Sequence, residues 1–72
     1  MSLLSQLESL LFVAEKALSP KDIAAILEAK EVRVQEVLEL LETKYNHDES
    51  GIHIFFHDGA IKMGTNPQNS KI

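Results

Sequence analysis

The sequence predicts an α+β fold in which three short helices are followed by one β-hairpin. Up to about residue 45, apolar residues recur every three or four positions, which is the period of an amphipathic helix. After residue 50 the period changes to two, and the dipeptide Asp58-Gly59 separates two short apolar runs, as a tight hairpin turn requires. Together these observations predict a winged helix, a helix-turn-helix core with a C-terminal β-hairpin wing.

Composition narrows the class of protein. The 72 residues suffice for one small domain, and 44% apolar with 25% charged residues is typical of a globular chain. The absence of cysteine excludes disulfides and thiolate metal sites. No apolar run approaches the length of a membrane span, so no membrane partner is expected. The net charge is −4 and the seven basic residues are scattered, without the cluster that phosphate binding needs.

The first helix is expected over residues 2–16. Ser5 and Glu8 match the pattern of a capping box within it. Its core stripe covers an arc of roughly 120°. The stripe consists of Leu3, Leu4, Leu7, Leu10, Leu11 and Ala14. Phe12 and Val13 fall outside this arc and are predicted to face away from the core.

The second helix is predicted to begin with Ser19 as its cap and Pro20 in its first turn. Its apolar stripe is expected to contain Ile23, Ile26 and Leu27.

The third helix is predicted to begin at about Val34, after a connection over residues 28–32, with Val32 and Val37 forming a hydrophobic staple. Its buried stripe is expected to be Val34, Val37, Leu38, Leu41 and Tyr45. Residues 19–45 thus have the proportions of a helix-turn-helix.

The hairpin register follows from the two-residue turn, which pairs His57 with Ala60 and, counting outward, Ile52 with Thr65. One face should pack on the helices, namely Ile52, Ile54, Phe56, Ile61 and Met63. The other should carry His53, Phe55, His57 and Lys62. The winged-helix domain is expected to span residues 1–66, and residues 67–72 lack periodicity and are interpreted as a tail.

Four segments carry a family resemblance: LESLLFVAEKALSPKDIAAIL, VQEVLELLETKY, GIHIFF and GAIKMGTNP. They resemble the N-terminal winged-helix domain of segregation and condensation protein B, an accessory subunit of bacterial condensin. The resemblance implies a non-enzymatic subunit that dimerises. It also implies binding to the kleisin subunit, segregation and condensation protein A, and through it to the SMC ATPase.

The same resemblance implies a cytoplasmic protein associated with the nucleoid, and a second winged-helix domain for which residues 67–72 would begin the linker. This sequence departs from the family's usual pattern at two places, the wing and the start of the third helix. The wing reads HDGAIKMGT instead of a Gly-Gly or Gly-aromatic tip with Arg-rich alternation, and Arg33 stands where Asp or Ser is usual.

The alternative function is a winged-helix transcriptional regulator that binds DNA. The third helix would enter the major groove with its outward side chains, which are Gln35, Glu36, Glu39, Glu42, Thr43 and Asn46. Glu36, Glu39 and Glu42 make this outer face acidic, so phosphates would repel it. Sequence-specific DNA binding by this domain is therefore not expected.

Three histidines, together with two aspartates, are the only candidates for metal or catalytic chemistry: His47, His53, His57, Asp48 and Asp58. His53 and His57 lie four residues apart on one strand, roughly 13 Å at about 3.3 Å per residue, which is too far to share one ion. We therefore expect no catalytic residue, no metal site and no cofactor. A metal-dependent enzyme fragment remains a remote third alternative.

Phe12, Val13 and Phe55 are the candidate protein-interface residues, because each is predicted on the face opposite its element's core stripe. Two interpretations of Phe12 stay open: contact with the wing or tail, or an anchor through which two copies self-associate. The kleisin segment is expected to be an amphipathic helix in a hydrophobic groove, with the acidic helix face steering a basic partner.

Overall fold

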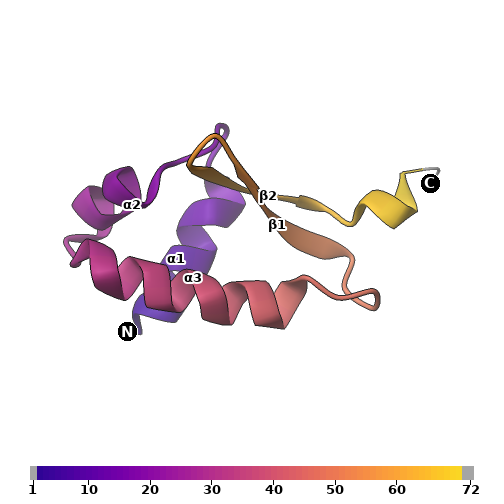
Figure 1. Cartoon of the computed structure of the whole chain (residues 1–72), viewed down its shortest axis with the longest axis horizontal. Coiled ribbons are helices and arrows are strands. Elements are labelled where there is room, and N and C mark those ends of the chain that lie inside the picture. Colours follow the sequence, from indigo (N-terminus) through magenta and orange to yellow (C-terminus); the bar gives the residue numbers. More distant parts are fainter. Residues whose placement is uncertain (1, 71–72) are drawn as a thin grey trace.

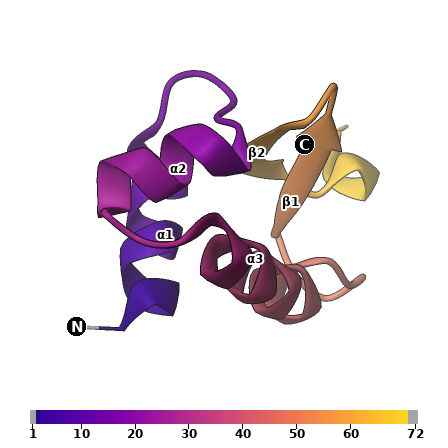
Figure 2. The ribbon, with the colours of Figure 1, turned by 60° about the vertical axis from the view of Figure 1, so that its left-hand side comes forward.

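The computed structural model describes residues 2–70 of the chain. Three helices precede a two-stranded antiparallel sheet and a short 3-10 helix (Figure 1). The elements are α1 (Leu3–Val13), α2 (Pro20–Leu27), α3 (Glu31–Tyr45), β1 (Ile52–His57), β2 (Ala60–Thr65) and η1 (Pro67–Asn69). The three helices lie together, and the hairpin lies beside the C-terminal half of α3 (Figure 2). In Figure 1, η1 extends beyond the hairpin toward the C-terminus.

The core forms where the three helices meet the packing face of the hairpin. In this core α1 and α2 both contact α3, while β1 contacts α3 and β2 contacts α1. The buried apolar residues are Leu7, Leu11, Ile23, Ala24, Val34, Val37, Leu38, Leu41, Ile54 and Ile61. All of α3's predicted core stripe is therefore inside, with Tyr45 half-buried at its end.

The first helix is shorter than predicted and has a different cap. It ends at Val13, and Ala14 is already extended, with ψ 128°. Ser2, not Ser5, caps it by accepting a hydrogen bond from the Ser5 backbone N–H at 3.1 Å. The chain then straightens so that Leu18 exchanges two backbone hydrogen bonds with Ile61, which adds a bridge to β2.

The turn between α2 and α3 is tighter than predicted. Ser19 and Pro20 begin α2 as expected, and Glu28 ends it in the left-handed region at φ 54°. Because this residue reverses the chain at once, α3 begins at Glu31 and not near Val34. Val32 is therefore an exposed helical residue and the predicted staple is wrong; Ile26, expected in the core stripe, is also exposed.

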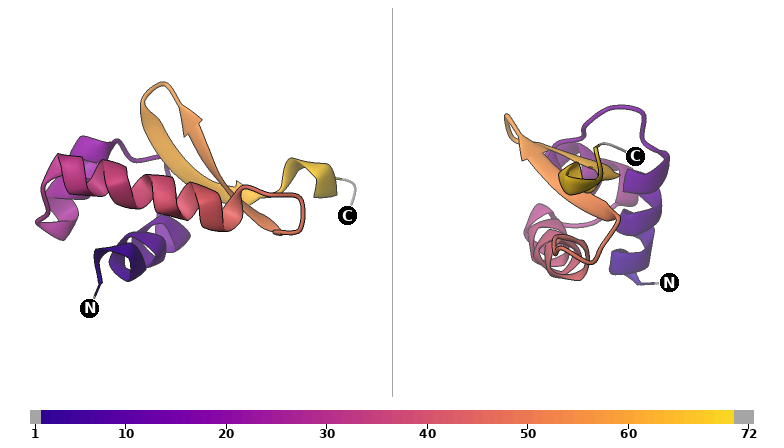
Figure 3. Two further views of the ribbon diagram at one scale, coloured as in Figure 1. Left: turned by 60° about the horizontal axis from the view of Figure 1, so that its bottom comes forward. Right: turned by 90° about the vertical axis from the view of Figure 1, so that its right-hand side faces the viewer.

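The hairpin has the predicted register, from His57 opposite Ala60 to Ile52 opposite Thr65. Asp58 and Gly59 both have positive φ, 50° and 75°, as a type I′ turn requires. One facing prediction is wrong, since Phe56 is 50% exposed. The hairpin tip projects past the helices (Figure 3). Leu18 bridges to Ile61 of β2, which is buried, whereas Phe56 opposite it on β1 stays half exposed.

The segment after β2 is better ordered than a tail without periodicity suggests. The sheet ends at Thr65 as expected, but Asn66 is buried and η1 follows. The Asn66 side-chain amide donates to the Ser50 carbonyl at 3.0 Å, and its oxygen accepts from the Gln68 N–H at 2.9 Å. Asn66 thus fastens the loop before β1 to the start of η1.

Candidate protein-interaction surfaces

A hollow of about 630 Å³ lies between α1, the end of α3 and the base of the hairpin. Its lining is mainly apolar. The lining residues are Ser5, Glu8, Ser9, Phe12, Val13, Tyr45, Ile52 and Met63. A second hollow of about 410 Å³ lies on the α2 side of α1. Its lining residues are Ser5, Gln6, Ser9, Leu10, Val13 and Leu27. Both hollows are open surface features of a kind that accepts side chains from another protein.

Phe12 and Val13 stand at the C-terminal end of α1, where both residues line the larger hollow. They are 76% and 70% exposed. Phe12 is therefore not buried by the wing or tail, although it lines the same hollow as Ile52 and Met63 of the wing. Large apolar residues exposed side by side are typical of an interaction site, and that role stays a prediction for this pair.

Phe55, the third candidate, is 38% exposed on the outer face of β1. Its ring covers Gly64 of β2, where an added Cβ would come within 3.0 Å of the ring. The His53 ring lies near the Phe55 ring, with the two centroids 6.3 Å apart. Part of the Phe55 surface is thus used inside the wing, which leaves less of it for a partner.

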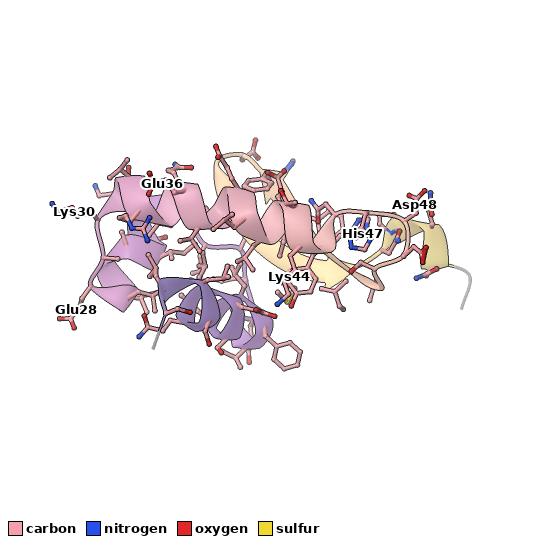
Figure 4. All side chains as sticks on the ribbon, turned by 90° about the horizontal axis from the view of Figure 1, so that it is seen from below. Glu28, Lys30, Glu36, Lys44, His47 and Asp48 are labelled. Atoms are coloured by element: carbon pink, nitrogen blue, oxygen red, sulfur yellow. The ribbon has the colours of Figure 1, made fainter. Side chains whose placement is uncertain are left out.

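A polar network closes the edge of the larger hollow. The Tyr45 hydroxyl donates to the Glu8 carboxylate, and the Lys44 ammonium lies 3.1 Å from the same carboxylate. Figure 4 shows the Lys44 side chain extending from α3 toward α1. The hydrogen bond from Tyr45 and then that from Lys44 lower the pKa of Glu8. The pKa values of Tyr45 and Lys44 are raised, in both cases chiefly by Glu8.

Sequence reasoning missed this network, because Glu8 was assigned to a capping box. A signal was present: Glu8 interrupts the apolar pattern one position after Leu7, on the flank of α1 that faces α3.

On α3, Glu36 and Glu39 are exposed and Glu42 is half-buried, and the outer face contains fewer free polar groups than the sequence suggests. Glu36 pairs with Arg33 one turn earlier, whereas Glu39 and Glu42 form no ion pair within the described residues. Asn46 does not point outward, because its side chain accepts from the Ile54 N–H at 2.7 Å and donates to the Ile54 carbonyl at 2.9 Å. Asn46 joins α3 to β1, and its side chain is therefore not available to contact bases in a DNA groove.

Two lysines near these surfaces are already engaged. Lys44 pairs with Glu8, and the Lys62 ammonium of the wing donates to the Glu15 carbonyl at 2.9 Å. Neither α3 nor the wing therefore presents the basic cluster that binds phosphates.

The histidines take part in local contacts. One ring nitrogen of His47 lies 3.0 Å from the Lys44 carbonyl, and one of His53 lies 3.0 Å from the His47 carbonyl. Within residues 2–70, no three His, Asp or Glu side chains gather as metal ligands would. Nor does that part of the chain contain a helix long and apolar enough to cross a bilayer.

Comparison with known proteins gives consistent results. The family described as segregation and condensation complex subunit ScpB matches residues 5–72. Segregation and condensation protein B of Clostridium botulinum is 36% identical over 66 residues, which cover 92% of this chain and 34% of that protein. The chain thus spans about a third of the length of such relatives.

Two solved structures share the fold. The crystal structure of a dimer of the ScpB N-terminal domain complexed with ScpA peptide has a TM-score of 0.83 and 29% identity, covering 93% of this chain and 84% of that one. ScpB from Mycobacterium tuberculosis has a TM-score of 0.86 and 26% identity, covering 94% and 42%. These likenesses confirm the winged helix, and the match over residues 5–72 shows that the chain belongs to the segregation and condensation complex subunit ScpB family.

Proposed function

We propose that this chain is a structural, non-enzymatic module of bacterial condensin that dimerises and binds a segment of the kleisin subunit. The observation that carries this is the likeness to an ScpB N-terminal domain solved as a dimer with ScpA peptide, at 29% identity over 93% of the chain. Through the kleisin, the module would join the SMC ATPase in chromosome condensation and segregation. It would act in the cytoplasm, at the nucleoid, and without a cofactor.

Exposed apolar residues support a protein-binding role. Phe12 and Val13 present a contiguous apolar surface at the end of α1, and Phe55 presents a smaller one on the wing. We propose these three as interface residues. Glu36, Glu39 and Glu42 supply a separate acidic face that would steer a basic partner. Residues 1–66 would form the interacting domain, and residues 67–72 would lead into a linker.

A DNA-binding transcriptional regulator is the less favoured function. The helix that would enter the major groove carries Glu36, Glu39 and Glu42 outward, and Lys44 and Lys62 are engaged within the chain. Phosphate contacts supply most of the affinity of proteins for DNA, and this surface offers few donors for them.

Titration calorimetry of the chain with a peptide from the cognate kleisin tests the proposal. We expect saturable binding, weakened at least tenfold when Phe12→Ala, Val13→Ala and Phe55→Ala are combined. Phe56→Ala is the matched control, because this neighbouring ring on the hairpin is 50% exposed, more than Phe55 at 38%, but is not among the proposed interface residues. No heat of binding by the wild-type chain at high peptide concentration would contradict kleisin binding.

A further inference from the structure

The sheet has two strands, so each strand has one edge that the other strand does not cover. In an antiparallel pair, the backbone groups of successive residues point alternately toward the partner strand and away from it. Ile61 exchanges both of its backbone hydrogen bonds with Leu18, on the side of β2 away from β1. Ile61 lies opposite Phe56, so the backbone N–H and C=O of Phe56, Ile54 and Ile52 point to the outer edge of β1.

Two side chains from the end of α3 and the following loop occupy most of this edge. The Asn46 side-chain amide donates to the Ile54 carbonyl at 2.9 Å, and its oxygen accepts from the Ile54 N–H at 2.7 Å. The Ser50 hydroxyl donates to the Ile52 carbonyl at 2.6 Å and accepts from the Ile52 N–H at 3.3 Å. Each side chain thus makes the pair of hydrogen bonds that a residue of a neighbouring strand would make. Of the outward residues on β1, Phe56 alone lacks such a partner within residues 2–70.

The backbone of both residues is itself fixed. The Asn46 N–H donates to the Glu42 carbonyl at 2.7 Å, at the end of α3. The Ser50 N–H donates to the His47 carbonyl at 3.1 Å, and the Ser50 carbonyl accepts from the Asn66 side chain at 3.0 Å. Because the backbone is already ordered, each side chain loses little further conformational entropy when it covers the edge.

The sequence of β1 would make an open edge a site of aggregation. IHIFFH consists of isoleucine, phenylalanine and histidine, without proline, glycine, lysine, arginine or an acidic residue. Segments of this length with high β-propensity and low charge stack readily with copies of themselves. Edge strands of natural proteins usually carry a lysine, a proline or a bulge that prevents such pairing. The β1 strand has none of these residues, and its register is continuous.

We infer that Asn46 and Ser50 take the place of a third strand and keep the edge of β1 closed to strand addition by another copy of the chain. Asn46 covers the central one of the three outward residues. Without it, the open edge extends from Phe56 over Ile54, and the β1 strand of a second copy can pair there. The inference does not depend on the proposed function, because it concerns backbone groups that the proposed interface residues leave unused.

Amide hydrogen exchange followed by NMR tests the cover in the folded chain. We expect Asn46→Ala to accelerate exchange of the Ile54 amide roughly tenfold, the factor that one hydrogen bond of ordinary net strength contributes. The Phe55 amide points toward β2 and serves as the internal reference, since it should change much less. In the wild-type chain, the Ile54 amide should exchange more slowly than the Phe56 amide, although both point away from β2.

Assembly of the same variant tests the consequence. Below the unfolding midpoint, sedimentation and thioflavin T fluorescence should detect large β-rich assemblies of Asn46→Ala and none of the wild-type chain. Tyr45→Phe is the matched control, because it removes a hydrogen bond from the neighbouring residue of α3 to Glu8 but leaves the β1 edge covered. Adding Phe56→Lys to Asn46→Ala places a charge on the edge strand and should suppress the assemblies.

The outcomes decide between an open edge and a general loss of stability. Assembly of Asn46→Ala alone, with faster exchange at Ile54, supports the inference. Equal assembly of Asn46→Ala and Tyr45→Phe would overturn it, because destabilisation would then be the cause. An Asn46→Ala chain that remains as free of assemblies as the wild type would also overturn it, as would an Ile54 amide whose exchange does not respond to the loss of Asn46.

Discussion

The Tyr45 hydroxyl donates a hydrogen bond to the Glu8 carboxylate, and so joins the last turn of α3 to the middle of α1. Lys44 adds an ion pair to the same carboxylate at 3.1 Å. The three side chains connect residues 36 and 37 positions apart in the sequence. They also form the polar edge of the larger hollow, so their ionisation affects both stability and the proposed interface.

Acid unfolding should report the Glu8 contacts. Because the pKa of Glu8 is lowered in the folded chain, its stabilising effect is complete above the ordinary value of 4.5 and is lost as the pH falls through the lowered value. Glu8→Gln should therefore destabilise the chain near neutral pH and flatten the fall in stability below pH 4.5. Urea unfolding across the acid range measures this, and Glu39→Gln should leave the profile unchanged.

Because the chain has a single tyrosine, the ionisation of Tyr45 at alkaline pH can be observed directly. Since the Glu8 hydrogen bond raises the pKa of Tyr45, its contribution is complete below pH 10.0 and disappears as the pH rises through the raised value. Ultraviolet titration of the phenol should give a midpoint above 10.0, and Glu8→Gln should move it down. A midpoint that Glu8→Gln leaves in place would show that the hydrogen bond is absent in solution.

Asn66 should matter more to stability than its place after the sheet suggests. Asn66→Ala removes partners of the Ser50 carbonyl and the Gln68 N–H, and leaves a buried space. We expect the free energy of unfolding to fall by about 2 kcal/mol, the order that a buried polar network of this size contributes. Denaturant unfolding measures it, and Gln68→Ala, an exposed neighbour, should change it little.

The sequence predicted the elements with strong local signals well. The Asp58-Gly59 turn determined the hairpin register because a two-residue loop allows only one pairing. Ser19 and Pro20 also marked the start of α2 correctly, because the preference of serine for the N-cap and of proline for the first turn depends only on residues within that turn.

The errors arose where distant contacts decide the outcome. The segment after α1 is extended because Leu18 pairs with Ile61, which lies 43 positions further along the chain. No local sequence pattern indicates that pairing. Phe56 fits the period of the packing face, yet it is half exposed, while Ile61 opposite it is buried beside Leu18. The Glu8 network likewise depends on how α1 and α3 cross. Exposure of Phe12 and Val13 was predictable, because it follows from helical period alone.

DNA binding should depend on the charge of the α3 outer face. In low salt, the wild-type chain should not retard duplex DNA in a mobility-shift assay. Changing Glu36, Glu39 and Glu42 together to lysine reverses three charges on one helix face and should create weak, salt-sensitive retardation. Gln35→Ala, on the same side of α3, is the control without a charge change. Tight binding by the wild-type chain would restore the regulator as a function.

The mass of the chain in solution, alone and with a cognate kleisin peptide, tests the central claim most directly. Size-exclusion chromatography with light scattering should give twice the chain mass of 8.1 kDa for the chain alone, and a larger mass with the peptide co-eluting. A species of 8.1 kDa at all concentrations, from which the peptide elutes separately, would contradict the account.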